Sequence, residues 1–197
     1  TAGRKTPMSS PGPGYTERDM DVLWQATAEA VREVIDRAAV DPATIACVAT
    51  AGHGNGLYLV DAQLRPVRPG IVSTDTRAAD YVARWYADGV ADAVREKTMQ
   101  SLWAAQPNAL LAWLKANEPE VIRQASWALM YKDYIRAKLT GEVYSELTDA
   151  SATSMMDVAT GQYDEELLRA YGIGDLAGLL PPVRRSDEIC GHVTQEA

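Results

Sequence analysis

Residues 50–61 read TAGHGNGLYLVD. Positions 52–56 hold three glycines around a histidine and an asparagine, and an apolar run lies on each side. The run before them, IACVAT at 45–50, predicts a strand covered on both faces. The run after them, GLYLV at 56–60, predicts a second strand. Because glycine lets other groups approach the backbone closely, the loop between them is either a tight turn or a place where a small polar ligand lies against the chain.

The pattern around this loop indicates an α/β fold. A helix is predicted to start at Thr16-Glu17-Arg18-Asp19, with Thr16 as its cap, and to end before Asp41-Pro42, and its apolar positions from Met20 to Ala38 form one buried face. The polar, small residues SELTDASAT at 145–153 predict a loop. Further strands are predicted at 67–72, 126–131 and 189–194, and further helices at 77–88, 91–100, 107–117, 132–140 and 164–171. Strands that alternate with helices are typical of α/β domains.

Composition excludes several classes of partner. The chain has 197 residues and a formal net charge of −8, which argues against nucleic acid and against an anionic membrane surface. No apolar run is long enough to cross a membrane, and residues 1–14 have no secretory core. Cys47, in the predicted buried strand, and Cys190 are isolated, which fits neither a disulfide framework nor a zinc site. We therefore expect a cytoplasmic protein.

Two short stretches carry the clearest polar side chains next to strands. His53, Gly54 and Asn55 follow the first predicted strand, at the strand end where open α/β sheets bind ligands. The alternative is a simple bend with two polar surface groups. Asp75 and Arg77 follow the third strand, where they could hold a polyol. The alternative, favoured on local grounds, is that Asp75 caps a helix and Arg77 lies on the surface.

Other polar groups are less specific. Trp103 could stack on a sugar ring and Gln106 could reach a hydroxyl, although a tryptophan taken alone is more often part of the core. Glu146 and Asp149 could bind a metal, but nothing supplies the remaining ligands, so they are interpreted as fixing a loop. No nucleophile with a base and no metal-ligand spacing is visible.

Several stretches taken together are more specific than any one of them. From about Pro11 to its end, the chain resembles the N-terminal domain of the FGGY family of carbohydrate kinases, and GNGLYLVD with STDTRA resembles the subgroup that acts on L-xylulose. The strongest matches are KDYIRAKLTGE and DASATSMMDV, and the others are PGYTERDMDVLW, AGHGNGLYLVD and RPGIVSTDTRA.

The resemblance implies an actin-like, RNase-H-type α/β domain against which a sugar lies. ATP and Mg²⁺ would bind mainly to a second domain, and the sugar's terminal hydroxyl would be phosphorylated. It implies substrate contacts from the segment 53–55, from Asp75 and Arg77, and from Trp103 and Gln106. Asn55 stands where xylulose kinases usually carry a histidine, and 73–74 reads Ser-Thr where relatives carry Trp-Asn, so the pocket must differ in detail.

The resemblance also indicates a fold that is incomplete at both ends. The family's Asp-x-Gly-Thr phosphate hairpin and its catalytic base, in a Gly-Asp motif, have no counterpart here. We therefore expect residues 1–186 to form most of the sugar-binding domain and 187–197 to begin a nucleotide-binding domain, with the isolated chain inactive. The expected partner is a sugar or polyol, with a homodimer possible. The alternatives are another substrate (D-xylulose, ribulose, erythritol or glycerol) or a non-catalytic sugar-binding module.

Overall fold

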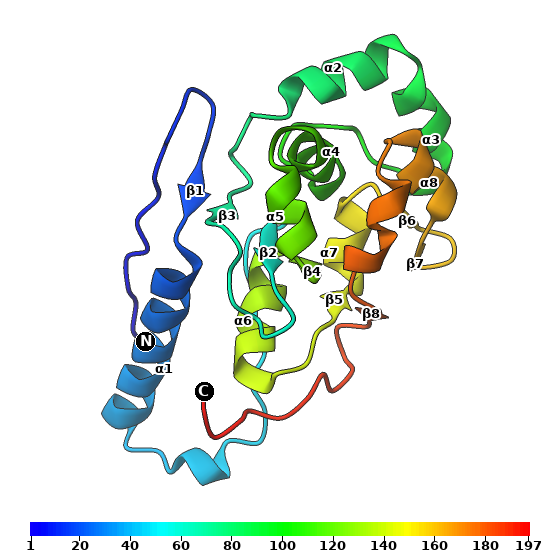
Figure 1. The fold of residues 1–197 in the computed structure, drawn as a ribbon. Coiled ribbons are helices and arrows are strands. Elements are labelled where there is room, and N and C mark those ends of the chain that lie inside the picture. The colour runs from blue at the N-terminus through cyan, green and yellow to red at the C-terminus, as the bar shows by residue number, and fades with distance from the viewer.

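The computed structural model describes residues 1–197 and begins with a segment packed on one side of the molecule (Figure 1). Strand β1 (Glu17–Arg18) is followed by helix α1 (Met20–Ala38) and a 3₁₀ turn, η1 (Pro42–Thr44). The helix ends before Asp41, as predicted, but it begins at Met20 and not directly after Thr16, so Thr16 is not the cap. Asp19 is, because its carboxylate accepts a hydrogen bond from the Val22 N–H at 2.9 Å.

Short strands form a row through the middle of the domain. Strand β1 pairs antiparallel with β3 (Gly70–Ile71), and β2 (Tyr58–Val60) pairs antiparallel with β4 (Trp127–Leu129). A bridge from Leu57 to Ile71 joins the two pairs. The order across the row is therefore β1, β3, β2, β4. The second and third predicted strands lie side by side, as their apolar pattern indicates.

Helices pack around this row and enclose the main core. Helix α4 is almost entirely buried and lies centrally in Figure 1, with α2 and α3 beyond it. Pro107 begins α4, as predicted, because proline has no N–H to lose in a first turn. The helices are α2 (Ala79–Ala87), α3 (Val90–Thr98), α4 (Pro107–Asn117), α5 (Pro119–Gln124), α6 (Tyr131–Thr140), α7 (Leu147–Ala152) and α8 (Glu165–Ala170).

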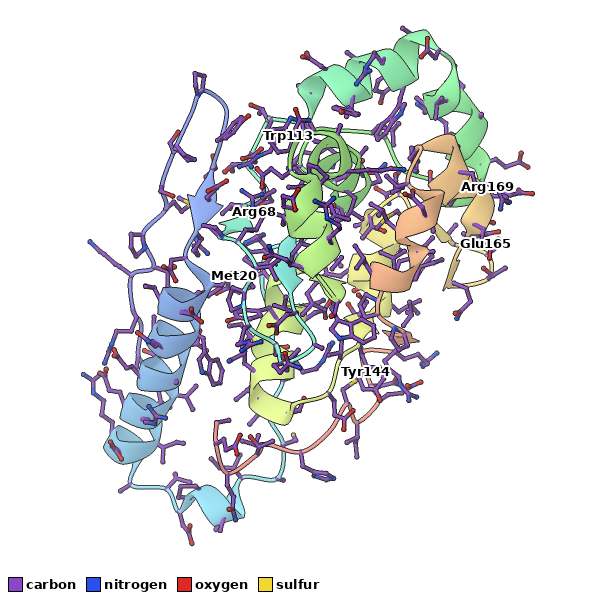
Figure 2. The ribbon with its side chains drawn as sticks, viewed as in Figure 1. Met20, Arg68, Trp113, Tyr144, Glu165 and Arg169 are labelled. Atoms are coloured by element: carbon purple, nitrogen blue, oxygen red, sulfur yellow. The ribbon has the colours of Figure 1, made fainter.

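A second, smaller core lies where α1 and α6 meet strands β2 and β4. Met20 and Leu23 are buried in it, and Figure 2 shows Met20 at the N-terminal end of α1. Farther along α1, Val31 and Val34 are exposed. The prediction of one continuous buried face is therefore wrong beyond the first turns of α1, because no other element covers that part of the helix.

The predicted strand at 45–50 does not form. These residues have no strand assignment and are largely exposed, and Val48 and Cys47 both face solvent. An extended segment becomes a strand only when a neighbouring backbone pairs with it, and no strand runs beside this one. The predicted strand at 189–194 is also absent, and its one backbone tie runs from the Thr194 N–H to the Leu139 carbonyl at 2.9 Å.

The predicted loop at 145–153 is instead regular structure. Strand β5 (Ser145–Glu146) pairs parallel with β8 (Val183–Arg184), and α7 follows directly. Strands β6 (Met156–Asp157) and β7 (Gln162–Tyr163) form a hairpin, and η2 (Gly174–Leu179) leads to β8.

None of the helices combines the length and the apolar character that crossing a bilayer requires.

Candidate functional site

The glycines of the 52–56 loop each lie against another part of the protein. A side-chain carbon at Gly52 would meet the Tyr131 ring at 2.4 Å, and one at Gly54 would lie 3.3 Å from Asp149 Oδ1. Gly56 has a φ of +78°, and a side-chain carbon there would lie 2.5 Å from the carbonyl oxygen of Ile71. The loop is therefore drawn tightly onto strand β3, helix α6 and helix α7, which a side chain at these positions would prevent.

His53 is held between two tyrosines. Its Nε2 lies 3.3 Å from the Tyr58 hydroxyl, and its ring centroid lies 4.9 Å from that of Tyr131. The rings of Tyr58 and Tyr131 meet edge to face with centroids 5.9 Å apart. Burial lowers the pKa of His53, so the imidazole is neutral at physiological pH and can both donate and accept a hydrogen bond.

Asn55 presents an unused acceptor in the same loop. Its backbone adopts a φ of +61°, a left-handed conformation that asparagine tolerates better than most residues. Its side-chain oxygen Oδ1 is buried and has no hydrogen-bond partner within the protein. A buried polar atom without a partner costs free energy, so this atom is suited to accept a hydrogen bond from a ligand hydroxyl.

A charged cluster borders the loop on the side of α6 and α7. Lys132 Nζ lies 2.7 Å from Glu146 Oε2 and 3.1 Å from Asp149 Oδ2. Burial acts to raise the pKa of Glu146, but hydrogen bonds from Lys132, Ser186 and Thr148 outweigh it and hold that pKa well below its usual range. Burial raises the pKa of Asp149 despite the attraction of Lys132. The expectation that Glu146 and Asp149 fix a loop is therefore wrong: Glu146 caps helix α7, and both carboxylates pair with Lys132.

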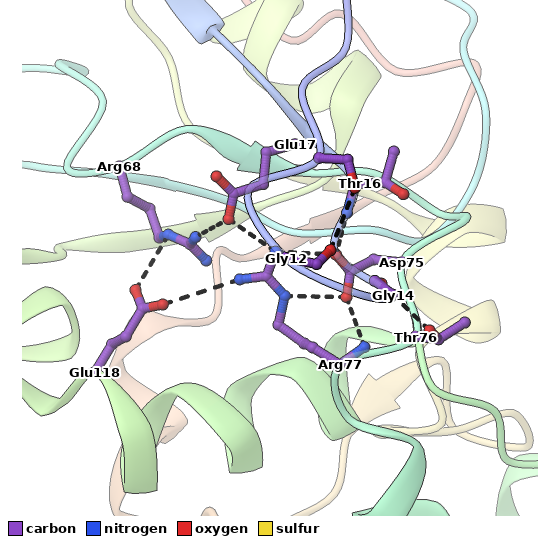
Figure 3. A network of polar contacts seen from close by, with 10 residues as sticks. Gly12, Gly14, Thr16, Glu17, Arg68, Asp75, Thr76, Arg77 and Glu118 are labelled. Atoms are coloured by element: carbon purple, nitrogen blue, oxygen red, sulfur yellow. Dashed lines mark hydrogen bonds and ion pairs between the residues drawn. The ribbon is translucent and has the colours of Figure 1, made fainter.

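Asp75 and Arg77 form an ion pair whose two side chains are fully buried. Asp75 accepts hydrogen bonds from Arg77 Nε and Nη2 and, at 2.6 Å, from the Thr16 N–H. Arg77 also donates to Glu17 at 2.7 Å (Figure 3). Its guanidinium lies 4.2 Å from the Tyr15 ring centroid. The local expectation of a helix cap and a surface arginine is wrong, because α2 begins at Ala79 without a side-chain cap and Arg77 is buried.

The other two predicted residues are split between surface and interior. Trp103 is 41% exposed, so it is not part of the core. Gln106 is buried, and both ends of its amide are used: Oε1 accepts from the Trp103 N–H at 3.1 Å and Nε2 donates to the Ala152 carbonyl at 3.1 Å. Gln106 thus ties the start of α4 to the end of α7.

The structure therefore brings His53, Gly54 and Asn55 into one site and gives Asp75, Arg77 and Gln106 internal partners. The sequence interpretation missed Arg18, Tyr58, Tyr131 and Lys132, which surround the loop. Tyr131 and Lys132 begin helix α6, one residue after the end of β4, so their position close to a strand end was a usable signal. Among the His, Cys, Asp and Glu side chains, no group of three or more is placed to hold a metal ion.

The chain matches a known protein family over its whole length. The model of the FGGY family of carbohydrate kinases, N-terminal domain, matches residues 1–197. Among curated relatives, the chain is 38% identical over 184 residues to "Probable L-xylulose kinase" of Pasteurella multocida, covering 93% of this chain and 38% of that protein. It is 37% identical over 187 residues to "L-xylulose/3-keto-L-gulonate kinase" of Escherichia coli, covering 95% of this chain and 38% of that protein.

A solved structure gives the same result for the fold. The xylulose kinase from Rhodospirillum rubrum superposes with a TM-score of 0.88 at 26% identity, over 98% of this chain and 39% of that one. The expected fold class, an α/β domain of the actin-like ATPase type, is confirmed. The chain spans about two fifths of the length of these relatives.

Proposed function

The chain belongs to the FGGY family of carbohydrate kinases, and from this premise we propose that it is the sugar-binding part of a kinase that phosphorylates a terminal hydroxyl of a pentulose, with L-xylulose as substrate. The names of the two curated relatives reported above support that substrate. We further propose that residues 1–186 form most of the sugar-binding domain and that 187–197 lead into a nucleotide-binding domain.

One observation carries the sugar site: the buried, unpartnered Oδ1 of Asn55 in a loop that also holds His53. A polyol offers hydroxyls in series, and each hydroxyl can both donate and accept a hydrogen bond. Asn55 Oδ1 accepts from one hydroxyl in this proposal. The neutral imidazole of His53, which already contacts the Tyr58 hydroxyl, serves a neighbouring hydroxyl. Gly54 lets the sugar approach the backbone, and exposed Trp103 offers an apolar face for the carbon chain.

Asp75, Arg77 and Gln106 take a supporting role in this proposal. Their polar atoms are largely used within the protein, so they hold strand β3 and helix α4 in place beneath the site. Contact with the sugar is therefore assigned to the 53–55 loop and to Trp103.

Mg-ATP supplies the phosphoryl group in kinases of this kind. Because no acidic or histidine cluster of this chain is placed to hold a metal, we assign none of its residues to Mg²⁺ and route no step through it. The contribution of this chain is to bind and orient the sugar.

The test is a calorimetric titration of L-xylulose into the chain, with D-xylulose and glycerol as competitors for the same site. Asn55→Gly keeps the left-handed backbone without strain and removes the acceptor, so it should weaken L-xylulose binding by about 2- to 10-fold, the range for a neutral hydrogen bond. Met99→Gly is the matched control, because Met99 is also left-handed, at φ +51°, but exposed. Equal affinities for wild type and Asn55→Gly would remove this loop from the sugar site.

A non-catalytic sugar-binding module is the second candidate. It has the same loop and the same binding result, so binding alone does not separate the two. Phosphorylation of L-xylulose by the complete polypeptide that contains this chain, measured by release of ADP from ATP, separates them.

A further inference from the structure

Two carboxylates share Lys132 beside the glycine loop, and only one of them has all its oxygens occupied. Glu146 Oε1 accepts hydrogen bonds from the Thr148 N–H and the Ser186 hydroxyl. Its Oε2 accepts from Lys132 Nζ and the Thr148 hydroxyl. Asp149 has a single side-chain partner, Lys132 Nζ, which lies 3.1 Å from Oδ2. Oδ1 of Asp149 accepts no hydrogen bond from the protein, so one charged acceptor is left over.

The free oxygen of Asp149 faces the glycine loop. A side-chain carbon at Gly54 would lie 3.3 Å from Oδ1. Oδ2 is the buried oxygen, while 13% of the side chain stays exposed. Gly54 stands between His53 and Asn55, the two residues assigned to the sugar in the proposed function. Asp149 therefore adds a second acceptor beside the loop that holds the buried, unpartnered Oδ1 of Asn55.

Asp149 is held in one orientation before any ligand arrives. Its backbone N–H donates to Glu146 Oε2 at 3.2 Å, and Lys132 fixes its Oδ2. The other cation beside the loop, Arg18, does not compete for Oδ1. Its guanidinium carbon lies over the Tyr131 ring, 5.9 Å from the centroid, and Lys132 is the cation that pairs with Asp149. An acceptor fixed in this way loses little conformational freedom when a ligand binds.

We propose that Asp149 determines specificity for the sugar, and that its Oδ1 accepts a hydrogen bond from the secondary hydroxyl next to the one that Asn55 binds. This rests on the proposed function and narrows its ligand class to sugars with two adjacent secondary hydroxyls, as at C3 and C4 of L-xylulose. An ionised carboxylate has no proton to donate, so a ligand carbon without a hydroxyl leaves Oδ1 unpaired. Hydrogen bonds to charged groups are stronger than neutral ones, so Asp149 contributes more to selectivity than Asn55.

The experiment compares L-xylulose with its 3-deoxy and 4-deoxy analogues, each of which lacks one secondary hydroxyl. All three are titrated calorimetrically into the chain. One analogue should bind wild type at least about tenfold more weakly than L-xylulose, because it leaves the charged oxygen of Asp149 unpaired. The other should bind about 2- to 10-fold more weakly, because it loses the neutral hydrogen bond to Asn55.

Variants at position 149 then assign the larger penalty. Asp149→Ala should bind L-xylulose and the more strongly rejected analogue about equally, while the penalty for the other analogue stays. Asp149→Asn keeps the shape and loses the charge, so it should retain part of the discrimination. Asp175→Asn is the matched control, because Asp175 also pairs with a lysine, Lys115 at 2.5 Å, but is exposed, and it should leave every affinity unchanged. Two variants at position 149 keep the test valid if one of them folds poorly.

Gly54→Ala tests the same contact from the loop. Gly54 does not have a positive φ, so alanine fits its backbone, but the added carbon takes the space through which a hydroxyl reaches Asp149 Oδ1. L-xylulose should therefore bind about tenfold more weakly or worse. Gly174→Ala is the matched control, because Gly174 also has no positive φ and its added carbon meets Arg169 at 3.1 Å, and it should leave the affinity unchanged.

The outcomes separate this proposal from the proposed function. If Asp149→Ala weakens all three ligands by the same factor, Asp149 only supports the fold and the assignment is overturned. Unchanged affinity for L-xylulose in Asp149→Ala or in Gly54→Ala also overturns it, and in each of these cases the proposed function stands. Binding of none of the three ligands by a wild-type chain that circular dichroism shows to be folded overturns both.

Discussion

The guanidinium of Arg77 donates two hydrogen bonds to the carboxylate of Asp75, from Nε to Oδ1 at 3.0 Å and from Nη2 to Oδ2 at 2.9 Å, and neither side chain reaches solvent. Glu17 joins the same guanidinium from β1. The N-terminal segment is thereby attached to the body by buried charges, which Figure 3 shows together with Glu118 and Arg68. Removing one of these charged side chains leaves the charges of the others buried without a partner.

Arg77→Met should therefore destabilise the fold by about 3–5 kcal/mol, the cost of breaking a buried ion pair from one side. Urea unfolding followed by circular dichroism measures this loss. Arg84→Met is the control: Arg84 is exposed, lies 4.3 Å over the Tyr81 ring, and makes no ion pair, so its loss should cost about 1 kcal/mol or less. Similar losses for the two variants would contradict the role given to the buried pair.

Gly56→Ala should be markedly more destabilising than Gly89→Ala. Both glycines have nearly the same positive φ, +78° and +76°, so the backbone strain and the change in unfolded-chain entropy cancel in the comparison. Only Gly56 meets another group, the Ile71 carbonyl at 2.5 Å, whereas Gly89 has open space. We expect the difference in unfolding free energy to be about 1–3 kcal/mol, as for other overpacked sites. Equal losses in thermal or urea unfolding would show that the loop can move off β3 at no cost.

Glu146→Gln should loosen the tie between α7 and the strand β8. Glu146 caps α7 by accepting from the Thr148 N–H at 2.8 Å, pairs with Lys132, and accepts from the Ser186 hydroxyl at 2.6 Å. Loss of its charge should cost about 2 kcal/mol, since several charge-assisted hydrogen bonds weaken together. Amide hydrogen exchange should speed up at Val183–Arg184.

The control for that variant is Glu165→Gln. Glu165 pairs with Arg169 at 3.2 Å one turn away on α8, and Figure 2 shows both side chains at the outer edge of the molecule. Because the pair is exposed, its loss should change stability by less than about 1 kcal/mol. Unchanged exchange at Val183–Arg184 in Glu146→Gln would contradict the proposed tie.

The free energy of unfolding should fall as pH rises from about 4 to 7, because Asp133 loses its proton over this range. Burial raises its pKa to about 6, against the attraction of Arg136, whereas the unfolded chain has the ordinary value of 3.8. Between these values the folded state binds more protons, so stability falls with rising pH, and the Asp133 contribution is lost once pH passes about 6. Asp133→Asn removes the titration, so its unfolding free energy relative to wild type should rise over this range. A difference that stays constant with pH would contradict the raised pKa.

Local patterns predicted most helices and the strand β2, because their apolar spacing and cap residues act within a few positions. They failed at 45–50, where a strand pattern lacks a neighbouring backbone, and at 145–153, where Glu146 caps a helix using Lys132 and Ser186 as further partners. Such errors are expected wherever a distant contact decides the outcome.

The residues of the candidate site also differ in whether local sequence patterns could predict their positions. The spacing of the glycines predicted the loop around His53 and Asn55. Glycine is needed wherever another group lies close against the backbone, and that need is visible in the local sequence. The burial of Arg77 depends on Glu17, which is 60 positions away in the sequence. The place of Arg18 depends on strand register, so no single-sequence pattern could have shown it.

The uncovered segment 45–50 has a consequence for the behaviour of the protein at high concentration. IACVAT has no charge, no proline and no glycine, and it is exposed without a pairing partner. Six-residue segments of this composition form cross-β stacks between identical chains. We therefore expect loss of this chain from solution to begin from the folded molecule and to increase with concentration, so raising the free energy of unfolding by substitutions elsewhere should not prevent it. A single lysine in this hexapeptide, such as Val48→Lys, is the gatekeeper that would prolong the shelf life of a concentrated stock.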